Sequence, residues 1–409
     1  MKLAEFANEV VLCIARQNGF HLAELFTFRQ TSLHSPLAVE CHRLQLDPNE
    51  QVDTFRTAAL GERNFGPDAE NSRLWQDLVS HYLRALMRMQ AGQSEDAFAE
   101  LTAALQLLHR ICASCSRWIL PLLHTLNDSI WFLSLSTHRA EEGARLINKS
   151  LTVCLTDRAP LTESRKWGVY RCAARLFRAY FYLGQLNLGA NVLRALGVGE
   201  LPALQRFPKA HTVEYRYWLG KFWFVAEEYT KACGELQLAW AECPQDALLN
   251  KRLILHLLLP LKVLTEACHP SPQLLQRYNM PPFYAAAISA IKLGDLCAYS
   301  SLLEAHDAQL LKLGTFLIWE KLTFFAYRNL LRRIFLLRES NTRLLLSSLL
   351  SPLKWMKQKK DLDGIATMIA TLITKGFIKG YISQEKATLV LSQKDPFPPL
   401  STVSIADSI

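Results

Sequence analysis

Residues 361–391 read DLDGIATMIATLITKGFIKGYISQEKATLVL, and the spacing of apolar residues changes part-way along this stretch. In the first half, apolar residues recur every three or four positions, at Leu362, Ile365, Ile369 and Leu372. This period predicts an amphipathic helix that begins after Asp361 or Asp363, both suitable N-caps, and ends at Gly376. In the second half the period is two: segments 377–382 and 388–391 flank a polar turn at 383–387, which predicts a β-hairpin.

Two further helices are predicted directly before this stretch. The first has an apolar stripe made of Tyr327, Leu330, Leu331, Ile334 and Leu337. The second is expected to begin near residues 341–342 and to continue past residue 349, with a kink or restart at Pro352. Three helices followed by a two-stranded ribbon is the order of elements in a winged helix.

Most of residues 1–320 is predicted to form successive helices joined by tight turns, which favours an α-solenoid of stacked hairpins. One unit lies within residues 217–244. There, Gly220 and Ala232 would let two antiparallel helices approach closely, Trp223 would fill the gap between them, and Pro244 would end the second helix. These spacings are similar to a tetratricopeptide repeat, and generic helical hairpins fit them equally well.

The predicted fold class is therefore all-α with a small β-ribbon: a tetratricopeptide-like α-solenoid that ends in a winged helix. The chain has only 17 Gly and 17 Pro in 409 residues, too few turn formers for a sandwich or barrel. The expected regions are a helical-repeat region at 1–205, a second helical part at 206–320, the winged helix at 321–394 and an extended tail at 395–409.

Charge is distributed unevenly along the chain. Residues 321–409 contain 14 Lys and Arg against 6 Asp and Glu, whereas residues 1–320 contain 32 against 31. A basic C-terminal quarter indicates a local anionic partner, which could be nucleic acid, an acidic protein or an anionic surface.

Of these partners, we favour nucleic acid, RNA or DNA, bound through its backbone. The open side of the third helix offers Thr367, Thr371 and Lys375 and lacks the Arg, Asn and Gln side chains that read base edges, so little sequence preference is expected. The residues predicted to bind nucleic acid are Arg328, Arg332, Arg333, Arg343, Lys357, Lys359, Lys360, Lys375, Lys379 and Lys386. Among the aromatic residues at 215–224, most of which fit a helix core, Trp218 is expected to be exposed and to contact a partner protein.

Several longer stretches of the C-terminal half carry a family resemblance. They are residues 250–262, 319–337, 376–383, 389–392 (LVLS) and 395–399 (DPFPP). Together they resemble the PCI-domain family, and within it the subunits of nuclear mRNA-export complexes, over residues 206–400. In this resemblance Leu331 stands where a Phe is common.

The resemblance implies a non-catalytic subunit of transcription and export complex 2, located in the nucleus at nuclear pores, with the cytoplasm as a second location. Its implied partners are a large mRNA-export scaffold protein and a small acidic disordered chain shared with the proteasome lid. An alternative is a purely structural PCI subunit of a signalosome-, proteasome-lid- or initiation-factor-type complex that binds no nucleic acid. An enzyme is a second alternative, and it would need a pocket with converging polar groups.

The sequence contains no motif for catalysis, a cofactor or a metal, and none of these is expected. Cys112 and Cys115 have the spacing CxxC but no second pair, so they are predicted to be buried helix residues. The longest apolar run, residues 253–264, is far shorter than the ~20 residues that span a bilayer. We therefore expect an intracellular protein without a membrane partner.

Overall fold

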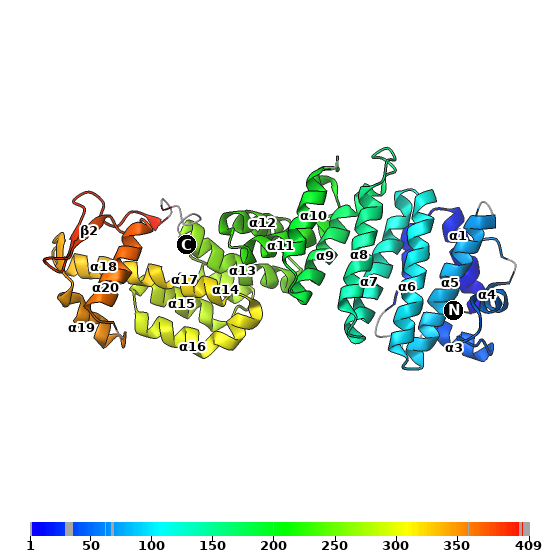
Figure 1. The fold of residues 1–409 in the computed structure, drawn as a ribbon, viewed down its shortest axis with the longest axis horizontal. Coiled ribbons are helices and arrows are strands. Elements are labelled where there is room, and N and C mark those ends of the chain that lie inside the picture. The colour runs from blue at the N-terminus through cyan, green and yellow to red at the C-terminus, as the bar shows by residue number, and fades with distance from the viewer. Residues whose placement is uncertain are drawn as a thin grey trace. The chain divides into compact units, whose positions relative to one another are not determined.

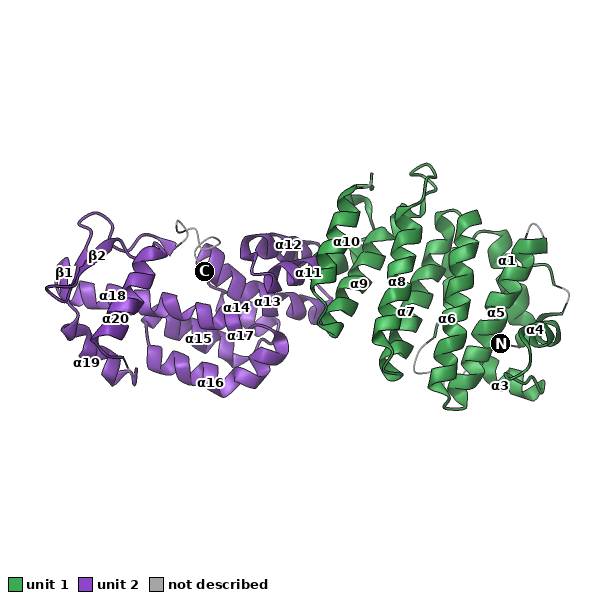
Figure 2. Ribbon diagram, in the orientation of Figure 1, with its two compact units in different colours: residues 1–218 green, residues 219–409 purple. Residues whose placement is uncertain are grey.

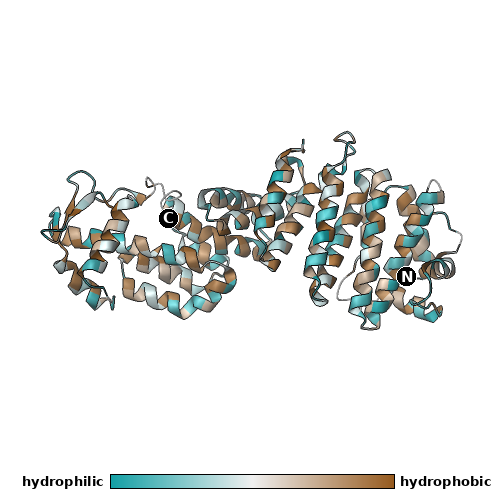
Figure 3. Cartoon of the chain, viewed as in Figure 1, coloured by the Kyte–Doolittle hydropathy of each residue, from teal (hydrophilic) through white to brown (hydrophobic). Residues whose placement is uncertain are grey.

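The computed structural model describes residues 2–28, 36–61, 63–66, 69–198, 200–358, 360–400 and 403. They form many helices and one small sheet (Figure 1), which confirms the predicted class of fold. The chain divides into two compact units, residues 1–218 and 219–409 (Figure 2). Apolar and polar residues alternate along the helices of both units (Figure 3), as expected when each helix packs one side into a core.

The first unit is built of helices, most of which pack on their neighbours in the chain. They are α1 (Leu3–Ala15), α2 (Gly19–Leu25), α3 (Pro36–Arg43), α4 (Val52–Leu60), α5 (Ala69–Gln90), α6 (Ser94–Ile111), α7 (Leu120–Ser136), α8 (Ala140–Leu155), α9 (Val169–Leu183) and α10 (Asn187–Val198). Helices α5 to α9 pack in sequence, each against the next. A Cβ at Gly143 of α8 would lie 2.6 Å from the Ser134 hydroxyl of α7, so this crossing depends on glycine.

Helix α11 (Lys209–Val225) begins in the first unit, and its last turns pair with α12 (Tyr229–Glu242) in the second unit. A Cβ at Gly220 would lie 2.7 Å from Leu236 Cγ, and α12 ends just before Pro244, so the predicted roles of Gly220 and Pro244 are confirmed. Trp223 lies beside α12. It is half-buried, and the Lys231 ammonium lies 4.9 Å from its ring centroid.

The helical part of the second unit surrounds an aromatic core. Its further helices are α13 (Leu248–Glu266), α14 (Pro272–Arg277), α15 (Pro282–Leu293), α16 (Leu296–Leu313) and α17 (Phe316–Lys321). Trp319 is fully buried, with its ring 5.1 Å from that of Phe283 and 5.5 Å from that of Tyr284. The Tyr299 hydroxyl donates a 2.6 Å hydrogen bond to the Trp319 carbonyl, which ties α16 to α17.

The C-terminal part of this unit is a winged helix with three strands rather than two. Its elements are α18 (Thr323–Leu337), β1 (Arg343–Leu345), α19 (Ser347–Trp355), α20 (Leu362–Thr374), β2 (Gly380–Ser383) and β3 (Thr388–Leu391). The strand order is β1-β3-β2, and both pairs are antiparallel. The prediction of a helix from residues 341–342 is wrong for residues 343–345, because Leu344 is buried between exposed neighbours and pairs with Leu389. Helix α19 begins after β1 and continues through Pro352.

The third helix of the winged helix is close to its prediction. The Asp361 carboxylate accepts a 2.8 Å hydrogen bond from the Gly364 amide, and Gly376 follows the helix with φ +75°. Leu362 is exposed rather than part of the buried stripe, and Met368 is buried instead. The hairpin begins at Gly380, three residues later than predicted.

Two further expectations concern cysteine burial and membranes. Cys112 is buried as predicted, whereas the prediction is wrong for Cys115, which is half-buried and directly follows the short helix Cys112–Ser114. The apolar run 253–264 lies in α13, where most of its side chains enter the core. In the part of the chain that the structure describes, no helix has the length and apolar content needed to cross a membrane.

Candidate nucleic-acid interface

Helix α18 presents two of the predicted arginines to solvent and buries the third. Arg332 and Arg333 are exposed, whereas Arg328, one turn earlier, is only 6% exposed. The Arg328 guanidinium donates hydrogen bonds to the carbonyls of Phe397, at 3.1 Å, and Pro398, at 2.8 Å. Burial, together with the neighbouring Arg332, lowers the pKa of Arg328 to about 10, so it remains charged at neutral pH. Arg328 therefore holds the C-terminal tail and is not available to nucleic acid, contrary to the prediction.

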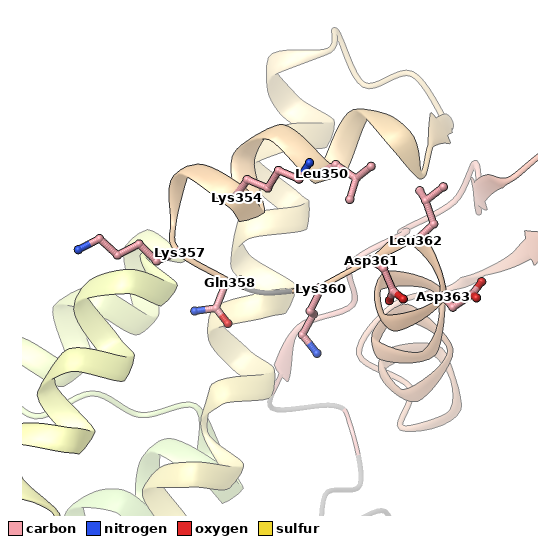
Figure 4. Close-up of a pocket in the computed structure, with 8 residues that line it drawn as sticks. All are labelled: Leu350, Lys354, Lys357, Gln358, Lys360, Asp361, Leu362 and Asp363. Carbon is pink, nitrogen blue, oxygen red and sulfur yellow. The ribbon is translucent and has the colours of Figure 1, made fainter.

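Three lysines, from the end of α19 and the connection between α19 and α20, lie around an open depression of about 990 Å³. Lys354 and Lys357 are exposed, and Lys360 is half-buried with its ammonium 5.5 Å from the Tyr327 ring. Figure 4 shows their ammonium groups pointing in different directions, with Lys357 turned away from Asp361. These lysines therefore form a diffuse positive region and do not converge on one point where a single anion would bind. Lys359 lies outside the described residues.

The sheet contributes exposed cations from three places. Arg343 begins β1, Lys379 precedes β2 with its ammonium 3.5 Å from Asp395, and Lys386 lies in the exposed turn between β2 and β3. Arg343 and Tyr381 both pair with Val390, on opposite sides of β3, so the three side chains share the outer face of the sheet.

Tyr381, which is 63% exposed, was not predicted as a site residue. The pairing of β2 with β3 places it beside Arg343 across Val390, whereas the alternation of residues 377–382 alone does not fix which side faces outward. Lys354 is another exposed cation of the winged helix that lies outside the predicted set.

Helix α20 presents few groups that read bases. Lys375 is half-buried, with its ammonium 5.1 Å from the Phe324 ring, and burial together with nearby Lys321 lowers its pKa. The hydroxyls of Thr367 and Thr371 donate to backbone carbonyls of their own helix at 2.9 Å. The open side of α20 is therefore short of free donors.

Trp218 lies in α11, distant in sequence from this basic region. It is half-buried, with its ring 5.7 Å from that of Phe181 in α9 and 5.3 Å from that of Tyr217. The structure thus packs much of the side chain that we expected to be exposed. Part of its surface remains accessible.

Hairpins of helices that lead into a three-helix, three-stranded module define a class of protein, the PCI-domain proteins, and the family model "PCI domain" matches residues 303–393. PCI domain-containing protein 2 of Xenopus laevis is 35% identical over 417 residues, covering 98% of this chain and 98% of that protein. A Protein CSN12 homolog of Mycosarcoma maydis is 34% identical, covering 99% of this chain and all of that protein, and one of Schizosaccharomyces pombe is 33% identical over 80% of this chain. The chain therefore belongs to the family of PCI domain-containing protein 2 and the CSN12 homologues.

Proposed function

We propose that this PCI-domain protein is a non-catalytic scaffold and adaptor subunit of a nuclear mRNA-export complex, transcription and export complex 2. In this proposal, the helical hairpins and the winged helix bind a large scaffold protein and a small acidic chain. The exposed basic residues of the winged helix bind the backbone of RNA or DNA with low sequence specificity. The protein would act in the nucleus, at nuclear pores.

One observation carries the nucleic-acid part of the proposal. Six predicted residues are exposed within a single small module: Arg332, Arg333, Arg343, Lys357, Lys379 and Lys386. Lys379 is paired with Asp395, and among the described residues no carboxylate forms an ion pair with the other five. Cations that are free of protein partners can displace the counterions condensed on nucleic-acid phosphates, which gives affinity without sequence preference.

The chemistry of α20 supports backbone binding rather than base reading. A winged helix that reads sequence does so through polar side chains on its third helix. Here the threonine hydroxyls on that helix donate to their own backbone, and Lys375 is half-buried over an aromatic ring.

The test is a filter-binding titration of RNA and duplex DNA across salt. The variant Arg332→Glu/Arg333→Glu/Lys386→Glu should lose most of its affinity. The slope of log K against log salt should become less negative by about 2 to 3, because each phosphate contact contributes about 0.7 to 0.9 to that slope. The control Lys149→Glu/Lys209→Glu/Lys312→Glu reverses three exposed lysines elsewhere with the same change in net charge and should bind like the wild type. Equal losses in both variants would mean that net charge, and not this surface, governs binding.

The name CSN12, borne by several relatives, favours a second candidate: a structural subunit of a signalosome-type complex. Affinity capture of the tagged full chain from nuclear extract, read by mass spectrometry, separates the two. Recovery of a large export scaffold with a small acidic chain supports the export proposal. Recovery of signalosome subunits contradicts it.

A further inference from the structure

The first two helices bring together a cysteine, a histidine and a glutamate at a place far from the basic winged helix. Glu9 and Cys13 are four residues apart on α1, so they lie on the same side of that helix. His21 lies on α2, where its amide is held by the capping side chain of Asn18 at 3.2 Å. One ligand atom from each of the three side chains lies within 4.8 Å of the other two.

The separation of His21 and Glu9 suits two ligands of one metal ion. His21 Nε2 and Glu9 Oε2 are 3.4 Å apart, which is long for a charge-assisted hydrogen bond of ~2.8 Å. Two ligands with bonds of ~2.05 Å to one tetrahedral zinc ion are separated by ~3.3 Å, close to the observed distance. The pair therefore has the separation of two neighbouring ligands around a shared ion.

The second nitrogen of His21 gives independent support. Its Nδ1 lies 3.5 Å from the carboxylate of Glu24, one turn along α2, which is an ion-pair separation; a small turn of the 80%-exposed Glu24 side chain would bring the two into hydrogen-bond range. Histidines that bind metals commonly donate their other N–H to a carboxylate, which fixes the tautomer and leaves the free nitrogen for the metal. Here the free nitrogen is Nε2, and it faces Glu9.

We propose that Glu9, Cys13 and His21 bind one Zn²⁺ ion, with Glu24 orienting His21 and a water molecule in the fourth position. The combination of thiolate and imidazole selects zinc over calcium or magnesium, which prefer oxygen ligands. When zinc binds, the Cys13 thiol releases its proton to solvent, and the resulting thiolate sulfur bonds to the zinc ion. The bound ion would join α1 to α2.

The position of the ligands leaves a path for the ion. Cys13 is only 2% exposed, but the side chains of His21 and Glu9 are 44% and 46% exposed, so zinc can enter from their side and the fourth position faces solvent. The spacing of the three residues matches no standard zinc motif, because the ligands come from two short helices joined by a tight turn. This explains why the sequence alone predicts no metal here.

Cobalt(II) is a suitable probe, because a thiolate ligand gives it a near-ultraviolet charge-transfer band and a tetrahedral site gives intense visible bands. The full-length protein, stripped of metal with a chelator, should bind one equivalent of Co²⁺ with both features, and one equivalent of Zn²⁺ should abolish them. Cys13→Ser should lose the charge-transfer band. Cys268→Ser removes an exposed cysteine elsewhere and is the matched control, which should keep it.

His21 and Glu9 are half-exposed, so replacing them tests the site even if replacing the buried Cys13 unfolds the protein. His21→Gln and Glu9→Gln should weaken Co²⁺ binding at least tenfold, and Glu24→Gln, the positioning residue, should weaken it by about 10- to 100-fold while leaving the charge-transfer band in place at saturation. If the wild-type protein shows no charge-transfer band at millimolar Co²⁺, the site does not exist. A band that persists in Cys13→Ser, or affinity unchanged in a folded His21→Gln, would equally overturn the proposal.

Discussion

Replacing Arg328 with methionine should release the C-terminal tail from the winged helix. Arg328 Nη2 donates to the carbonyls of Phe397 and Pro398, and its guanidinium lies 5.8 Å from the Phe397 ring centroid. The tail has a second attachment, because the Lys379 amide donates a 2.9 Å hydrogen bond to the Pro396 carbonyl. Methionine keeps much of the length of the side chain and removes all of its donors.

The magnitude follows from these contacts. Hydrogen bonds from a charged donor stabilise by about 1.5–3 kcal/mol each, so losing two costs about 3–6 kcal/mol. Removing a buried charge recovers part of the cost of its desolvation. We therefore expect the tail to be held less tightly by about 2–4 kcal/mol, which corresponds to about a 30- to 1,000-fold larger open population.

Hydrogen exchange measures this opening at one defined amide. In Arg328→Met the Lys379 amide, which bonds to the tail, should exchange about 30-fold faster or more, while amides in the middle of α20 should change far less. Arg332→Met, one turn along α18 and exposed, is the matched control and should leave Lys379 exchange unchanged. Identical exchange in both variants would show that Arg328 does not hold the tail.

Three other outcomes are expected from named contacts. Gly380→Ala should lower the free energy of unfolding by about 1–3 kcal/mol in urea, because its Cβ would lie 2.3 Å from the Val390 carbonyl oxygen. Gly234→Ala, in open space within α12, should instead raise it by up to about 1 kcal/mol, and a loss of stability there would contradict the helical assignment. Burial and nearby Lys149 lower the pKa of His109 from its ordinary value to about 4, so the unfolded chain binds a proton here more readily than the folded protein does. The free energy of unfolding is therefore highest above pH 6.5 and decreases as the pH falls toward 4, by about 2 kcal/mol at pH 5. His109→Gln should shrink the difference in urea stability between pH 7.5 and pH 5, and an unchanged difference would rule out this residue as its source.

Local sequence signals were sufficient for most of the winged helix. The cap at Asp361, the glycine at residue 376 and the apolar spacing between them specify α20 without help from distant residues. Strand β1 could not be predicted in the same way. Residues 344–346 are three successive leucines, which fit a helix or a strand equally well, and the pairing with β3 about 45 residues later decides between them.

The candidate site was predictable as a region but not residue by residue. Net charge located the basic module, and six of the predicted residues are exposed there. The failure at Arg328 has a long-range cause, because the tail that covers it lies 69 residues further along the chain. Helical spacing puts Arg328 and Arg332 on one side of α18, and only the folded tail distinguishes the buried arginine from the exposed one.

The central claim is that exposed cations of the winged helix bind nucleic-acid phosphates, and the salt dependence of RNA binding by the wild-type protein tests it most directly. If the six exposed residues all contact phosphates, the plot of log K against log salt should have a slope of about −4 to −5. Affinity should then fall about 10²- to 10³-fold between about 50 and 200 mM salt. A slope near zero, or no detectable binding at the lowest salt, would contradict the claim.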